Sequence, residues 1–130
     1  MNGRNLVLDS NIVIYLSKKS LELRSFKNDA DTLFISIITY MEVWGFDFSS
    51  DDEKLFIEAF CKAVNIIQID EEIVEKVIEI RQRAKIKLPD AIIAATGKIL
   101  KGTLVTRNTD DFSSLKDEII LLNPFTSPAD

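Results

Sequence analysis

The chain has 130 residues, a formal net charge of −5 and a hydrophobic fraction of 46%. This length fits one domain on a scale of about 150 residues per domain, and the composition is globular rather than disordered or fibrous. We therefore expect a single domain over residues 1–130. No apolar run reaches the roughly 18 residues of a membrane span, and Asp9 interrupts the first apolar stretch, which is atypical of a secretory signal.

The residue types that are missing narrow the possible chemistry. The sequence has no histidine and one cysteine, Cys61. Ser–His–Asp catalysis, Cys–His catalysis and imidazole ligation are therefore excluded, as are an internal disulfide and a cysteine-based zinc site. Acidic residues outnumber basic ones by 21 to 16, so the chain lacks the overall basic character typical of nucleic-acid binding.

Short apolar runs alternate along the chain with segments of helical spacing. The expected strands are 5–8, 33–37, 64–69, 103–106 and 119–122, and the expected helices are 11–17, 39–48, 51–63, 71–84 and 89–100. The strand runs are continuously apolar, which is typical of strands covered on both faces of a parallel sheet. The alternation predicts an α/β domain with right-handed crossovers.

Two helices have the clearest patterns. The segment 71–84 begins with acids and ends with bases, in agreement with the helix dipole. Its expected apolar side consists of Ile73, Val74, Val77, Ile78 and Ile80. The segment 89–100 has Pro89 in its first turn, where proline is favoured, and it is apolar almost all round, which predicts an interior helix.

Acidic residues stand where the apolar runs end. Asp9 follows the first strand, Glu42 lies in the expected first turn after the second strand, and Asp90 opens the buried helix. Asp110 and Asp111 follow the fourth strand. Because the carboxyl ends of parallel strands and the helix N-termini that follow share one edge of the sheet, where ligands bind, we expect these acids to converge.

Each acid also has a purely structural interpretation. Asp9 fits a helix N-cap, Thr39 and Glu42 have the spacing of a capping box, Asp90 complements a helix dipole, and 108–111 fits a turn. However, Asp9 and Asp90 adjoin strongly apolar sequence, where an unpaired carboxylate is costly. A hard cation bound by carboxylate oxygens would offset that cost.

Four segments together resemble a known family. They are Leu8-Asp9-Ser10-Asn11; Ser36, Thr39 and Glu42; Leu88-Pro89-Asp90-Ala91-Ile92-Ile93-Ala94-Ala95; and Val105-Thr106-Arg107-Asn108 with Asp111-Phe112. In this order and spacing the chain resembles the PIN-domain ribonucleases, and in particular the VapC-type toxins of bacterial toxin–antitoxin pairs. The resemblance covers nearly the whole chain.

The resemblance implies a fold, an activity and a set of acids. The fold would be a three-layer α/β/α sandwich with a parallel sheet of about five strands. The activity would be cleavage of RNA by an endoribonuclease that uses Mg²⁺ or Mn²⁺. By motif position its core acids are Asp9, Glu42 and Asp90, and the fourth acid, which varies in the family, is expected to be Asp111, with Asp110 as the alternative.

The same resemblance assigns further roles. Asp9, Asp90 and Asp111 would bind the metal, and the supporting residues would be Thr106, Asn108, Ser10 and Asn11. Bound cations would activate a water and stabilise the leaving oxygen, and metal-bound water ionises readily, so the mechanism needs no histidine. We expect Lys85, Lys87 and Arg107 to contact RNA, whereas Arg81 and Arg83 fit a solvated helix end.

Partners and location follow from the resemblance as well. It implies a homodimer, a VapB-type antitoxin and a cytoplasmic location. Aromatic residues are concentrated in one part of the chain, namely Tyr40, Trp44, Phe46, Phe48, Phe56 and Phe60. Such a group is typical of a core, although a surplus of large apolar side chains also suits a dimer interface or a groove for a partner helix.

Other classes of protein remain as alternatives. A haloacid-dehalogenase-type phosphatase also ends its first strand with an aspartate, but it needs a second acid at the position of Asn11. A receiver-like switch has paired acids after its first strand, where this chain has Asp9 alone. An inactive PIN-like binding module would lose one of the core acids, all of which are present.

Overall fold

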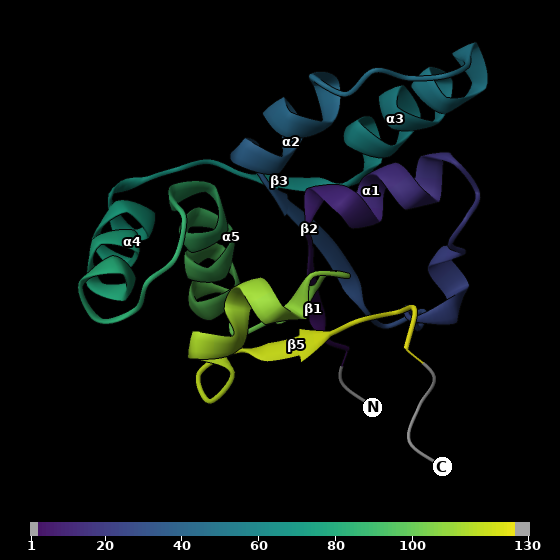
Figure 1. Ribbon diagram of the computed structural model, residues 1–130. Coiled ribbons are helices and arrows are strands. Elements are labelled where there is room, and N and C mark those ends of the chain that lie inside the picture. Colours follow the sequence, from purple (N-terminus) through teal and green to yellow (C-terminus); the bar gives the residue numbers. More distant parts are fainter. Residues whose placement is uncertain (1–2, 127–130) are drawn as a thin grey trace.

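The computed structural model describes residues 3–126, which form a parallel five-stranded sheet with helices on both faces (Figure 1). The strand order is β3-β2-β1-β4-β5, with β1 in the centre. The strands are β1 (Asn5–Leu8), β2 (Thr32–Ser36), β3 (Asn65–Ile67), β4 (Thr103–Val105) and β5 (Ile120–Leu122). The helices are α1 (Ser10–Ser17), α2 (Ile37–Trp44), α3 (Asp51–Ala63), α4 (Glu71–Arg83) and α5 (Leu88–Ile99), with 3₁₀ segments η1 (Leu23–Ser25) and η2 (Thr109–Leu115). The predicted α/β/α fold is confirmed.

The central strand β1 shows why the strand runs are continuously apolar. Leu6 and Leu8 contribute to one hydrophobic cluster and Val7 to the other, and all three are fully buried. Successive side chains of a strand point to opposite faces of the sheet. Because both faces are covered by helices, the three residues of β1 that follow Asn5 are all apolar.

The two clusters define the two helical layers. One cluster joins the sheet to α4, α5 and η2, with Phe112 of η2 fully buried in it. The other joins the sheet to α1, α2 and α3. Figure 1 shows these two groups of helices on opposite sides of the sheet.

Helix α5 is the interior helix that the sequence predicts. Residues 91–97 are all buried, whereas Leu88 and Pro89 at its start are exposed. Helix α4 differs from the prediction, because only Ile73, Val77 and Ile80 of its expected apolar side are buried. Two further members of that side are exposed, Val74 by 42% and Ile78 by 52%.

The predicted bounds of α2 are wrong. The helix begins at Ile37 because the Ser36 side chain accepts a hydrogen bond from the Ile38 amide, and it ends with Gly45 as its C-cap. The capping box of Thr39 and Glu42 is therefore wrong as well. Thr39 is a buried residue of the first turn, and Glu42 lies in the second turn, not the first.

The remaining predicted bounds differ from the structure by a residue or two. Strand β3 is shorter than expected because the chain turns toward Asp70, whose carboxylate accepts from the Ile73 amide and caps α4. The aromatic group is mostly core: Tyr40, Trp44, Phe48, Phe56 and Phe60 belong to the cluster under α1, α2 and α3. Phe46 differs, with 38% of its surface exposed. Over residues 3–126, no helix has the length and apolar character needed to cross a bilayer.

Candidate functional site

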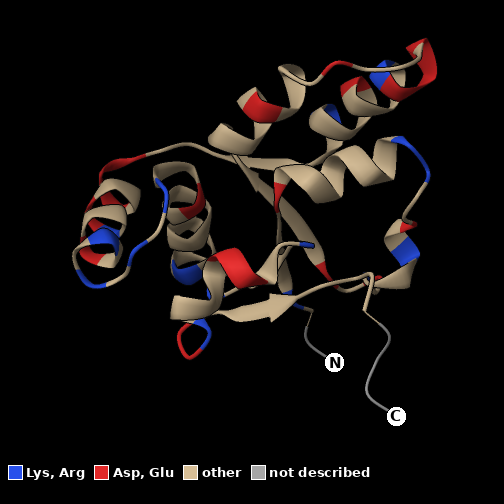
Figure 2. Ribbon diagram, viewed as in Figure 1, with Lys and Arg blue, Asp and Glu red and all other residues tan. Residues whose placement is uncertain are grey.

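The carboxyl edge of the sheet gathers acids from four separate elements. Asp9 follows the central strand β1, Glu42 lies on α2, Asp90 in the first turn of α5 and Asp111 in η2. Figure 2 shows acidic segments at the start of α1 and on α2, α5 and η2, around this edge. The candidate site therefore draws its acids from segments that are distant in the sequence.

Asp9 is at the centre of this arrangement and is only 7% exposed. One carboxylate oxygen accepts from the Ser10 amide at 2.8 Å, so Asp9 is also the N-cap of α1. The other oxygen accepts from the Thr106 hydroxyl at 2.8 Å and from the Asn11 side-chain amide at 3.1 Å. Its cap role and its place in the site are therefore compatible.

The donors to Asp9 are themselves held in place. The Thr106 hydroxyl oxygen, which is fully buried, accepts from the Asn108 amide at 3.0 Å. The Asn11 carbonyl oxygen accepts from the Arg107 amide at 3.1 Å. These bonds connect the end of β4 to the start of α1 and fix the orientation of the Asp9 carboxylate.

Glu42 is connected to the same turn from the other side. The Ser10 hydroxyl donates to the Glu42 carboxylate across the space between α1 and α2. Glu42 itself is exposed. Ser10 therefore links two acids, one through its amide and one through its hydroxyl.

The pKa of Asp90 shows that the acids act on one another. Burial raises it to about 6, helped by the charges on Asp9, Asp111 and Glu42, while the charge on Lys87 lowers it. An opposite or like charge shifts a pKa strongly only when it is near. The charges of Asp9, Asp111 and Glu42 therefore all act on the Asp90 carboxylate.

The pKa of Asp9 is also raised. Burial is the main cause, and the charge on Asp111 adds to it, while the hydrogen bonds from Thr106, Ser10 and Asn11 act in the opposite direction. Asp111 is thus the acid of η2 whose charge acts on both Asp9 and Asp90. Asp110, the alternative, is its neighbour in the same 3₁₀ segment, and both side chains are exposed.

The donor set suits a hard divalent cation. Carboxylate, hydroxyl and amide oxygens are the ligands of Mg²⁺, which keeps several waters and needs only one or two direct carboxylates. A bound cation would also relieve the repulsion that raises the pKa of Asp90. Within residues 3–126, no three acidic side chains form a group that could hold a metal ion as they stand.

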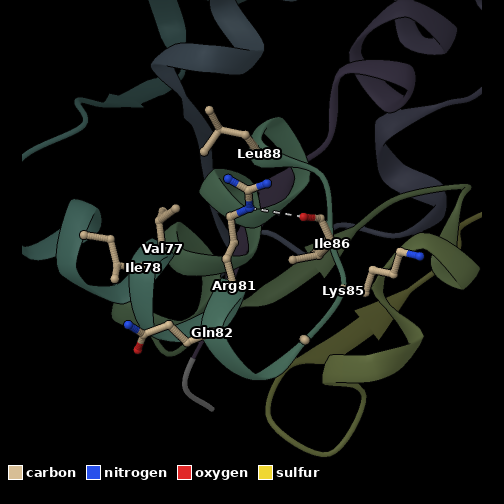
Figure 3. A pocket seen from close by; sticks show the side chains of 8 residues that line it. Val77, Ile78, Arg81, Gln82, Lys85, Ile86 and Leu88 are labelled. Atoms are coloured by element: carbon tan, nitrogen blue, oxygen red, sulfur yellow. Dashed lines mark hydrogen bonds between the residues drawn. The ribbon is translucent and has the colours of Figure 1, made fainter.

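The two expected RNA-binding lysines lie in the connection that leads to Asp90. Lys85 and Lys87 are exposed in the connection between α4 and α5, and the charge on Lys87 acts on Asp90. Figure 3 shows Lys85 at the edge of a pocket formed by α4 and the connection to α5. In this pocket the Arg81 side chain donates to the Ile86 carbonyl oxygen at 3.3 Å. Arg83 forms an ion pair with Glu118. Arg81 and Arg83 therefore have structural partners of their own.

Arg107 has neighbours that the sequence did not indicate. Its guanidinium carbon lies 5.1 Å from the centre of the Tyr15 ring and 4.5 Å from that of Phe125. It also donates to the Tyr15 hydroxyl at 2.9 Å. The only signal in the sequence was an aromatic residue in each of two distant segments, which does not reveal that they meet.

A parallel α/β sandwich with acids gathered at its carboxyl edge is the architecture that the four motifs predict. A family model described as the PIN domain matches residues 6–118. The chain therefore belongs to the PIN-domain family. PIN domains are generally nucleases and generally use divalent metal ions.

Solved structures similar to this chain come from toxin–antitoxin complexes. A toxin–antitoxin complex from Klebsiella pneumoniae is 32% identical, with 94% of this chain and 99% of that chain covered and a TM-score of 0.68. VapBC-1 from nontypeable Haemophilus influenzae is 26% identical, with 94% and 99% covered and a TM-score of 0.72. VapBC2 from Rickettsia felis, bound to a promoter DNA fragment, is 22% identical over 92% and 98%, with a TM-score of 0.75, and shows the fold alone. A comparison with curated proteins gave no match. The predicted resemblance to VapC-type PIN domains is confirmed.

Proposed function

We propose that this protein is a metal-dependent endoribonuclease and the toxin of a toxin–antitoxin pair. The observation that carries the proposal is the placement of Asp9 after β1, with Thr106 from the end of β4 donating to it and Glu42 of α2 joined to the same turn through Ser10. The charges of Asp9, Asp111 and Glu42 also act on Asp90 at the start of α5. Membership of the PIN-domain family supports nuclease chemistry at this edge. The similarity to the Klebsiella pneumoniae toxin–antitoxin complex supports the toxin role.

The acids of the candidate site and their hydrogen-bond partners have different roles in the proposed cleavage. Asp9, Asp90 and Asp111 would hold Mg²⁺ or Mn²⁺, and a bound ion would supply a more acidic water and offset the charge of the scissile phosphate. Thr106 and Asn11 orient the Asp9 carboxylate by donating to it. Glu42, held by the Ser10 hydroxyl, completes the acidic rim of the site.

The contact with RNA is local, because the chain as a whole is acidic. Lys85 and Lys87 precede Asp90 in the connection between α4 and α5, and the charge on Lys87 acts on Asp90. Neither lysine forms an ion pair within residues 3–126. Arg107 lies on the other side of Asp9, next to Thr106. We propose that these three cations contact phosphates on either side of the cleaved bond.

The decisive test is cleavage of a mixed RNA pool with and without a chelator. We expect cleavage that stops when EDTA removes the metal. Asp9→Asn and Asp90→Asn should each lower the rate at least about 100-fold, more than the loss of a residue that merely supports a ligand. Asp117→Asn, at an exposed acid outside the site, is the control. Full activity of Asp9→Asn, with an unchanged circular dichroism spectrum, would refute the proposal.

The partners in this proposal are a VapB-type antitoxin, a second copy of the chain and RNA, all in the cytoplasm. Growth arrest on expression should be relieved when a short neighbouring gene is expressed as well, and light scattering should give twice the mass of the 14.7 kDa chain. The phosphatase alternative fits less well. Asn11, where such an enzyme needs an acid, donates its amide to Asp9 and has no proton to give to a leaving group.

A further inference from the structure

A hollow of about 390 Å³ adjoins the acids, on the side of α1 and α2. It shares Ser10, Asn11 and Glu42 with the candidate site and continues away from them toward Phe46. This volume lies in the range of sites that hold small molecules or parts of larger ligands. Any ligand in the hollow is therefore next to whatever binds at the acids.

The far wall of the hollow is apolar and aromatic. Ile14 and Tyr15 of α1 form one side, and Phe46, in the connection after α2, forms the other. Phe46 is 38% exposed, although its edge packs against Phe48 with ring centres 5.6 Å apart. An accessible ring that packs against a partly buried neighbour, Phe48, is a preorganised surface for a flat apolar ligand.

A lysine lies over the Phe46 part of this wall. The Lys18 ammonium lies 5.2 Å from the centre of the Phe46 ring and 3.2 Å from a Glu53 carboxylate oxygen. It brings positive charge to a place where the Glu42 carboxylate would otherwise repel a phosphate. Aromatic rings combined with a cation are typical of surfaces that bind single-stranded nucleic acid.

We propose that this hollow binds one base of single-stranded RNA, that of the nucleotide next to the phosphate held at the acids. This inference rests on the proposed ribonuclease function. The base would stack on Phe46, as unpaired bases do on aromatic side chains, and Lys18 would face the adjoining phosphate. The hollow therefore determines where along the RNA the cut falls.

The hydrogen bonds of Asn11 limit which features of an RNA base the hollow could recognise. Its amide donates to Asp9 and to the Thr106 hydroxyl oxygen, and its carbonyl oxygen accepts from the Arg107 backbone. Its groups are thus engaged and are not offered to a base edge. Stacking is tolerant of sequence because every base has a π-face. We therefore expect the hollow to distinguish bases by size and stacking strength rather than by a hydrogen-bond pattern.

The test uses single-stranded RNA octamers in which one abasic ribose is moved through the positions. Binding is measured by fluorescence anisotropy on the full chain carrying Asp90→Asn, which prevents cleavage and leaves the hollow intact. We expect one position at which the abasic ribose weakens binding about 5- to 100-fold, the range for stacking of one base. Adding Phe46→Ala should weaken binding of the intact octamer by the same factor and abolish the abasic effect at that position.

Two controls separate stacking from other effects. Phe46→Leu keeps an apolar side chain without a ring and should behave as Phe46→Ala does, even if alanine disturbs the fold. Ile120→Ala removes an exposed apolar side chain on β5 and should change nothing. On the active chain, Phe46→Ala should broaden the base preference at the cleaved site.

The outcomes distinguish this inference from the proposed function. If the wild-type chain neither binds nor cuts RNA, both are refuted. If it cuts RNA but the abasic effect persists in Phe46→Ala, or is absent at every position, only the base site is refuted. Weaker capture of an antitoxin by Phe46→Ala without any effect on RNA would assign the hollow to a protein partner and would equally refute the base site.

Discussion

Asp9 and Asp31 are both buried but differ in their hydrogen-bond donors, and the pKa values of the two carboxyl groups are shifted in opposite directions. Asp9 and Asp31 are 7% and 6% exposed. Asp31 accepts from the Arg4 guanidinium at 2.7 Å and from the Arg4 and Asn28 amides, and the Arg4 hydrogen bond holds its pKa well below its usual range. Asp9 has only neutral donors, and burial raises its pKa. The Asp31 carboxylate is neutralised by Arg4 within the protein, whereas under the proposed function a bound cation would neutralise the Asp9 carboxylate.

Asp31→Asn should therefore destabilise the fold in a pH-dependent manner. The pKa of Asp31 is lower in the folded chain than the value of about 3.9 in an unfolded one. Its contribution to the free energy of unfolding is thus complete above about pH 5 and is lost as the pH falls toward the folded pKa. Urea denaturation at pH 7 and pH 3 should show a difference between wild type and variant that shrinks at pH 3. Asp29→Asn, at an exposed neighbour, should show none, and an equal difference at both pH values would contradict the ion-pair explanation.

Thr106 offers a second test at the scale of one residue. Thr106→Val keeps the shape but removes the hydroxyl that donates to Asp9 and accepts from the Asn108 amide. Under the proposed function, we expect RNA cleavage to fall about 10- to 100-fold, as for residues that orient a metal ligand, while stability falls by about 1–3 kcal/mol. Thr103→Val, at another buried threonine on β4, is the matched control for cleavage. Equal cleavage by both variants would show that the bond to Asp9 is not needed.

At the scale of elements, two glycines near α5 differ in whether a larger side chain would fit in their place. A Cβ on Gly102, just before β4, would lie 2.5 Å from the Asn5 carbonyl oxygen, a backbone atom that cannot give way. A Cβ on Gly97, inside α5, would meet Ile119 at 3.6 Å, an ordinary contact. Only Gly102 is therefore required by packing.

Alanine substitutions should separate the two glycines by thermal or chemical denaturation. Gly102→Ala should cost about 1–3 kcal/mol, because β1 and β4 must move apart. Gly97→Ala should raise the stability by up to about 1 kcal/mol, because alanine is the better helix former. A destabilised Gly97→Ala together with an unchanged Gly102→Ala would contradict the packing described for β1, β4 and α5.

The elements also differ in how far the sequence predicts them. Helix α5 is predicted within a residue because its signals are local: Pro89 at the start and an unbroken apolar run. Helix α2 is mispredicted because Ser36 and Thr39 are both acceptable caps, and the choice depends on where β2 ends. Val74 and Ile78 of α4 look like core residues, but the helical repeat turns them away from the face that holds Ile73, Val77 and Ile80.

At the scale of the whole molecule, topology explains why the acids were predictable and their neighbours were not. The rule that strand ends share one edge needs only the order of the elements, so Asp9, Glu42, Asp90 and Asp111 follow from the sequence. The link from Ser10 to Glu42 and the contacts of Arg107 with the Tyr15 and Phe125 rings depend on side-chain packing between distant segments. The role of the exposed ring of Phe46 likewise required knowing where α2 ends.

The overall charge sets a final prediction. A chain of net charge −5 attracts RNA only where cations are concentrated, and each phosphate contact with single-stranded nucleic acid adds about 0.7 to the slope of log affinity against log salt concentration. Replacing both Lys85 and Lys87 with alanine should therefore lower the slope by up to about 1.4, measured by anisotropy in the Asp90→Asn chain. Replacing Lys54 and Lys62, exposed on α3, changes the net charge equally and should leave the slope unchanged. Equal slopes for the two pairs would mean that net charge, and not the cations beside Asp90, governs the approach of RNA.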